Sequence, residues 1–171
     1  LTYPLTNLYS SMSKTKLLKY LASFFLLITI LGTSLYSQTF NVLVFSKTEG
    51  FRHNSIPNGI SAIEQLGQQH DFGVDATEDA STFTFESLQQ YEAIIFLSTT
   101  GDVLNRNQQD AFERYIRNGG GFVGIHAASD TEYNWPWYGE LVGAYFDSHP
   151  AIQPATIEVA DRIHPSTKHL P

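Results

Sequence analysis

Hydrophobic residues are concentrated in short continuous runs that polar segments separate. The runs at residues 40–45, 93–97 and 122–125 are apolar and rich in Val, Ile or Phe. Apolar runs of this length are typical of parallel strands that are covered on both faces. A weaker alternation at residues 72–77 predicts one more strand. We expect residues 122–125 to form a buried strand near the centre of the sheet.

The segments between these runs have helical spacing. Ile60, Ile63 and Leu66 fall on one helical face. A second apolar stripe follows Asn105, which has the spacing of a capping box with Gln108. Alternation of strands and helices favours a parallel sheet with right-handed crossovers and helices on both faces. The predicted fold class is therefore α/β, a three-layer α/β/α sandwich with a mostly parallel sheet.

The pattern changes beyond Asp130. Aromatic residues crowd around Pro136, and residues 141–146 have the spacing of a helix. Residues 155–159 predict a further strand, and residues 161–171 are irregular. Because no terminating element follows, we expect a domain that is truncated at its C-terminus.

Residues 1–37 have the layout of a secretory signal, with residues before Met12 as an upstream overrun. A lysine-rich stretch precedes the apolar run 21–31, and small residues follow up to Ser37. The run is shorter than the roughly 20 apolar residues that a membrane span needs. We expect cleavage near Ser37, no stable span afterwards, and an exported (periplasmic or secreted) domain at residues 38–171. An uncleaved anchor is the alternative.

Charge and cysteine content exclude several classes of function. The 171 residues carry a net charge of −7, and residues 38–171 hold 7 Lys and Arg against 17 Asp and Glu. Such an acidic domain is a poor partner for nucleic acid or anionic lipid. The chain has no cysteine, which excludes disulfides, zinc–thiolate sites and cysteine nucleophiles.

The strongest candidate for chemistry is His126. Three glycines at 119–121 end a helix, residues 122–125 form the predicted strand, and His126 follows directly. Ligands of open α/β sheets bind just beyond the carboxyl ends of the strands. Imidazole titrates near neutral pH, so His126 can act as acid, base or metal ligand. Asp130 could orient it or bind a sugar hydroxyl; the alternatives are a structural histidine and a helix cap.

A second polar loop follows the first predicted strand. His53 lies there with Glu49 and Arg52 beside it. Carboxyl ends of parallel strands meet at one edge, so His53 and His126 are expected to share a site. Glu49 would supply an acid and Arg52 a hydroxyl-binding cation. The alternative is a solvated polar loop.

Further candidates lie after Asp130. His149 would complete a three-histidine set with His53 and His126, which suits zinc or another divalent ion. No close H-x-x-x-H spacing supports such a metal. Trp135 and Trp137 could stack on a sugar ring, because an aromatic side chain combines a large apolar face with hydrogen bonding at its edge. The alternative is a hydrophobic cover over the sheet.

Four motifs follow one another along the chain: GFRHNSI at residues 50–56, the glycine-rich block at 119–126, residues 143–150 and residues 164–171. In this order they resemble the ThuA-like (trehalose utilisation) family, which has the class I glutamine amidotransferase-like fold and a flavodoxin-like sheet. The resemblance covers nearly all of residues 40–171. The family's domain normally continues further, and a site completed there would be incomplete here.

The resemblance implies a role in sugar metabolism, with trehalose or related, also 3-keto, glycosides as ligands. His126 stands where glutamine amidotransferases carry their cysteine nucleophile, so glutaminase activity is not expected. One hypothesis is an exported sugar hydrolase, lyase or isomerase that uses His126, His53 and Asp130, with Glu49, Arg52, Trp135, Trp137 and His149 binding substrate. The others are a non-catalytic carbohydrate-binding domain of a longer secreted protein and a fragment that does not fold alone.

Overall fold

The computed structural model of the chain describes residues 40–171. The signal segment predicted at residues 1–37 lies outside the described part. Within residues 40–171, no helix has the length and apolar content needed to cross a membrane.

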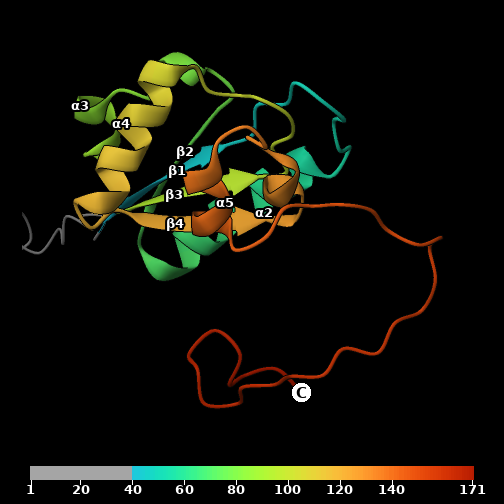
Figure 1. Ribbon diagram of the computed structural model, residues 1–171. Helices are drawn as coiled ribbons and strands as arrows, with labels where there is room; N and C mark the ends of the chain where they lie inside the picture. The colour runs from blue at the N-terminus through green and yellow to red at the C-terminus, as the bar shows by residue number, and fades with distance from the viewer. Residues whose placement is uncertain (1–39) are drawn as a thin grey trace, which may run out of the picture.

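A parallel sheet forms the centre of the domain, with strand order β2-β1-β3-β4 (Figure 1). All three neighbouring pairs are parallel. This order is that of a flavodoxin-like sheet, and it confirms the predicted α/β class. The carboxyl ends of all strands therefore meet at one edge. The strands are β1 (Asn41–Phe45), β2 (Gly73–Thr77), β3 (Ala93–Leu97) and β4 (Gly121–Ile125).

Helices cover both faces of the sheet, which gives the predicted three layers (Figure 1). On one face, Ile63 of α2 packs against Val42, Val44, Ile95 and Leu97. On the other face lie α3, α4 and α5. The helices are α2 (Ile56–His70), η1 (Ala80–Thr82), α3 (Phe85–Leu88), α4 (Arg106–Arg117), η2 (His126–Asp130) and α5 (Pro136–Val142).

The larger core lies between the sheet and the α4–α5 layer and consists mainly of aromatic rings. Phe96 of β3 is at its centre, with ring centroids of Phe45, Phe112 and Tyr138 at 5.3, 5.3 and 5.7 Å. All four side chains are fully buried. Truncating a buried aromatic ring costs about 3–5 kcal/mol. This core therefore fixes α4 and α5 relative to the strands.

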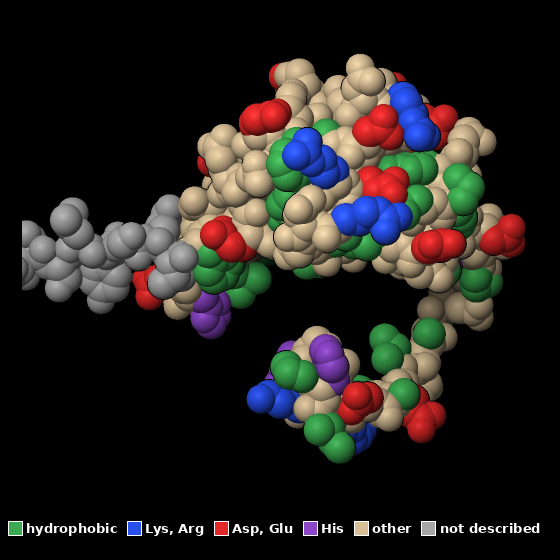
Figure 2. Space-filling model, turned by 60° about the vertical axis from the view of Figure 1, so that its left-hand side comes forward, with side chains coloured by type: hydrophobic (Ala, Val, Ile, Leu, Met, Phe, Trp, Pro, Cys, Tyr) green, Lys and Arg blue, Asp and Glu red, His purple; other side chains and the backbone are tan. Residues whose placement is uncertain are grey.

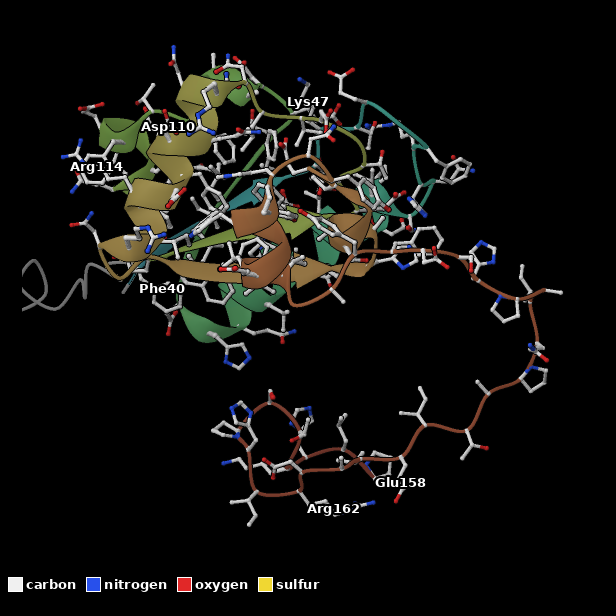
Figure 3. The ribbon with its side chains drawn as sticks, viewed as in Figure 1. Phe40, Lys47, Asp110, Arg114, Glu158 and Arg162 are labelled. Atoms are coloured by element: carbon white, nitrogen blue, oxygen red, sulfur yellow. The ribbon has the colours of Figure 1, made fainter. Side chains whose placement is uncertain are left out.

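The predicted capping box of α4 is confirmed. The Asn105 side chain accepts a hydrogen bond from the Gln108 backbone N–H at 3.1 Å, and the Gln108 side chain accepts one from the Asn105 N–H at 2.8 Å. Near the other end of α4, the guanidinium of Arg114 lies 3.7 Å from the ring centroid of Phe85 (Figure 3). This cation–π contact joins α4 to α3.

The prediction that residues 122–125 form a buried central strand is wrong. β4 is the outer strand of the described sheet. Phe122 packs against the aromatic core, whereas Val123, which points to the opposite face, is 45% exposed. Side chains of α2 pack over β1 and β3 on that face, so β4 is only partly covered by the described residues.

Two predictions for the chain after Asp130 also differ from the structure. The helix there is α5, not 141–146, because Pro136 is compatible with its first turn and Gly143 ends it at φ 90°, a conformation that favours glycine. Residues 155–159 do not form the predicted strand. They lie in a segment that stands apart from the body of the domain, with Glu158 on it (Figures 1, 2 and 3). No neighbouring strand among the described residues offers it hydrogen-bond partners.

Candidate functional site

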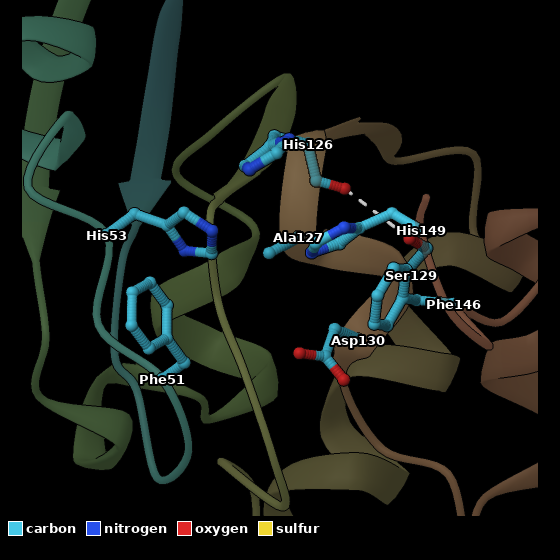
Figure 4. Close-up of a pocket in the computed structure, with 8 residues that line it drawn as sticks. All are labelled: Phe51, His53, His126, Ala127, Ser129, Asp130, Phe146 and His149. Carbon is cyan, nitrogen blue, oxygen red and sulfur yellow. Dashed lines mark hydrogen bonds between the residues drawn. The ribbon is translucent and has the colours of Figure 1, made fainter. Parts of the chain in front are cut away.

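A pocket of about 470 Å³ opens at the carboxyl edge of the sheet (Figure 4). Three segments build it: the loop after β1, the helical turn η2 after β4, and the chain after α5. Its volume lies in the range of about 300–1,000 Å³ that is usual for small-molecule sites. The lining residues are Phe51, His53, His126, Ala127, Ser129, Asp130, Phe146 and His149.

The loop after β1 is fixed by hydrogen bonds to the loop after β3. The backbone N–H groups of Glu49 and Gly50 donate to the Thr100 carbonyl at 2.8 and 3.3 Å. The Thr100 hydroxyl in turn donates to the Phe51 carbonyl at 3.0 Å. A Cβ at Gly50 would lie only 3.3 Å from that hydroxyl oxygen, so glycine permits the close approach. The loop thus presents Phe51 and His53 to the pocket.

His126 enters the pocket from a strained turn. Its φ is 55°, in the left-handed region that non-glycine residues rarely adopt. Ala128 in the same turn is buried, and a Cβ at Gly124 would come within 3.2 Å of its methyl group. Such backbone strain costs of order 1–3 kcal/mol and clusters at functional sites. The packing of η2 against β4 therefore holds His126 at the edge of the sheet.

The two predicted histidines meet in the pocket. The ring centroids of His53 and His126 are 4.5 Å apart, with planes at 82°. Phe51 approaches the His53 ring edge-on at 4.9 Å. Burial lowers the pKa of His53, the neighbouring His126 lowers it further, and Asp130 partly opposes the shift. His53 is therefore held neutral near pH 7, and its buried Nδ1 has no hydrogen-bond partner within residues 40–171.

Asp130 and the segment after α5 are joined by Tyr133. The Tyr133 hydroxyl lies 2.7 Å from an Asp130 carboxylate oxygen and 2.7 Å from the Phe146 carbonyl. The Phe146 N–H donates to the Ser129 carbonyl at 2.8 Å. Burial and the Asp130 carboxylate raise the pKa of Tyr133 to about 12, so its hydroxyl stays protonated. These bonds hold Phe146 against η2, next to Asp130.

Four of the predicted site residues line this pocket: His53, His126, Asp130 and His149. The two tryptophans do not line it. Trp135 is buried in the aromatic core, and Trp137 packs against that core, with the centroids of the two tryptophan rings 4.9 Å apart. Their positions correspond to the alternative in which they cover the sheet. Their rings are needed there to bury the α4–α5 face.

Glu49 and Arg52 also lie outside the pocket lining. Glu49 forms an ion pair with Lys47 at 2.8 Å, and Arg52 forms one with Glu78 at 2.6 Å. Both pairs are largely exposed, so each charge is neutralised on the surface. The charged side chains of this loop are thus paired with other surface charges, and His53 is the polar side chain that the loop contributes to the pocket lining.

The aromatic residues in the pocket are Phe51 and Phe146, which the sequence analysis did not select. Each stands close to a selected histidine, two residues before His53 and three before His149. That proximity was the available signal. The described residues hold no group of three His, Asp or Glu side chains placed to bind a metal ion. The three-histidine set therefore lines one pocket without forming a metal centre there.

Comparison with known proteins gives a consistent result. The family described as ThuA, trehalose utilisation, matches residues 41–171. The chain is similar to a ThuA-like protein from Bacteroides uniformis, at 31% identity and a TM-score of 0.67, over 82% of this chain and 59% of that one. A ThuA-like protein from Parabacteroides merdae is 23% identical, with a TM-score of 0.47, over 58% and 37%. The chain thus spans less than two thirds of either solved protein. No curated protein matches it.

Proposed function

Because the chain belongs to the ThuA (trehalose utilisation) family, we propose that it is an exported domain that acts on trehalose or a related glycoside by histidine acid/base chemistry. The observation that carries the proposal is the contact between the rings of His53 and His126 inside the pocket at the carboxyl edge of the sheet.

The pair is suited to move protons. Burial and the neighbouring His126 lower the pKa of His53, which favours the neutral imidazole that a base needs. His53, with its lowered pKa, is the base that accepts a proton from the reacting group. His126 is the acid that returns a proton to the leaving or rearranging oxygen. Asp130, which lines the same pocket, stabilises the imidazolium and binds a sugar hydroxyl.

The reaction class that this chemistry serves is hydrolysis, elimination or isomerisation of a glycoside. The test is product analysis after incubation of the protein with trehalose and with 3-keto-glycosides. His126→Ala should abolish turnover while the thermal unfolding transition remains cooperative. His70→Ala, which changes a histidine at the end of α2, is the matched control and should turn over normally. Normal turnover by His126→Ala would remove His126 from the mechanism.

A second candidate function is carbohydrate binding without catalysis. It is favoured by Phe51 and Phe146, two exposed large apolar side chains in the same pocket. It predicts saturable binding of glycosides by calorimetry and no product on prolonged incubation. Detection of product that depends on His126 would rule this candidate out.

Export is proposed from the signal-like pattern of residues 1–37. The test is to express the protein with its N-terminus intact and to identify the N-terminal residue of the purified product. Cleavage near Ser37 and recovery outside the cytoplasm support export. An intact N-terminus in the cytoplasmic fraction would contradict it.

A further inference from the structure

Two phenylalanine rings form walls of the pocket. Phe51 comes from the loop after β1 and Phe146 from the chain after α5, and their rings lie on opposite sides of the pocket in Figure 4. Phe51 is 71% exposed and Phe146 is 39% exposed. A single exposed apolar side chain is unremarkable, but two that line one concave site mark a surface for a ligand with an apolar face.

Both walls rest on backbone that is already fixed. The Phe51 carbonyl accepts a hydrogen bond from Thr100, and the Phe51 ring contacts His53 edge-on. The Phe146 N–H donates to Ser129, and its carbonyl lies 2.7 Å from the Tyr133 hydroxyl. A ligand therefore pays little for ordering these segments, because they are held before it arrives.

The polar groups of the pocket complete the description of its ligand. None of the described residues that line it is Lys or Arg. The nearby cations Lys47 and Arg52 are paired with Glu49 and Glu78. Phosphate and carboxylate ligands are normally held by such cations. Asp130 is the one carboxyl group in the lining and would repel an anion.

We propose that Phe51 and Phe146 are the stacking walls of the pocket and that its ligand is an uncharged glycoside, not a sugar phosphate or a sugar acid. This inference rests on the proposed function, since the glycoside class comes from it. The apolar face of a pyranose ring lies against one wall or between the two. Asp130, Ser129 and the histidines then face its hydroxyl groups.

The test measures binding of trehalose and of trehalose 6-phosphate by calorimetry at pH 8. Wild type should bind trehalose at least about tenfold more tightly than the phosphate ester. Phe51→Leu and Phe146→Leu, which keep apolar volume but remove the ring face, should each weaken trehalose binding by about tenfold. Phe51→Trp, which keeps a ring face, should stay within about threefold.

Phe40→Leu is the matched control. Phe40 lies just before β1, at the opposite edge of the sheet (Figure 3). Its side chain is 37% exposed and stacks on the ring of Phe72. It should leave trehalose affinity unchanged. Tighter binding of trehalose 6-phosphate, or unchanged affinity in both pocket variants, would overturn this inference and leave the proposed function standing. Absence of binding and turnover with trehalose and 3-keto-glycosides in wild type would overturn both.

Discussion

The left-handed backbone of His126 gives a sharp prediction about stability. A non-glycine residue in this region costs roughly 1–2 kcal/mol. Glycine escapes that cost but loses about 0.5–1 kcal/mol through its greater freedom in the unfolded chain. His126→Gly should therefore be more stable than His126→Ala by about 0.5–1 kcal/mol, since both variants remove the imidazole and differ only at the strained φ of 55°.

The assay is urea unfolding of both variants, with a matched pair at His53, which is not among the residues with positive φ. There, glycine adds only chain entropy, so His53→Gly should be less stable than His53→Ala. The opposite signs at the two positions are the diagnostic result, and both His126 variants should lack turnover. If glycine destabilises equally at both positions, the inference that the backbone at His126 is strained is refuted.

Two further predictions concern a buried carboxylate and a hydrogen-bonded tyrosine hydroxyl. Glu132 is buried and accepts hydrogen bonds from the Leu104 N–H at 2.7 Å and the Gln109 amide at 2.6 Å, so Glu132→Ala should cost about 2–4 kcal/mol in urea unfolding. Burial raises the Glu132 pKa above 4.5, so the proton-linked part of the free energy of unfolding is fully present below the unfolded pKa and is lost as pH rises through the folded pKa. Glu132→Gln, which cannot ionise, should abolish that pH dependence, and an unchanged pH profile would contradict it. Tyr133→Phe should speed amide hydrogen exchange at Phe146 by about tenfold, since one restraint on that segment is lost; unchanged exchange would show that the hydroxyl does not hold it.

Local patterns in the sequence predict most of the fold. The apolar runs that became β1, β3 and β4 and the Asn105–Gln108 capping box are short-range signals, and each is realised in the structure. Parallel strands bring their carboxyl ends together, so the sequence alone assigns the loops that carry His53 and His126 to one edge of the sheet. The meeting of the two rings followed from topology and did not require a motif.

What failed needed tertiary information. An apolar run does not state how many faces will be covered, so β4 was predicted to be more central than it is. Aromatic residues suit a sugar site and a core equally well, and Trp135 serves the core. Glu132 gave no signal, because the groups that satisfy its carboxylate lie 28 and 23 residues earlier in the chain.

The position of the pocket follows from the order in which the strands are laid down. After β1 the chain adds β2 on one side and then β3 on the other, so the loops after β1 and β3 leave toward opposite faces, to α2 and α4 respectively. A crevice opens at such a switch point, beyond the carboxyl ends of the strands. The bonds from Glu49 and Gly50 to Thr100 join the two diverging loops. Because η2 after β4 closes the far side, His53 and His126 contact each other in the wall of the pocket that the fold leaves open there, and a ligand rather than a core side chain is free to fill it.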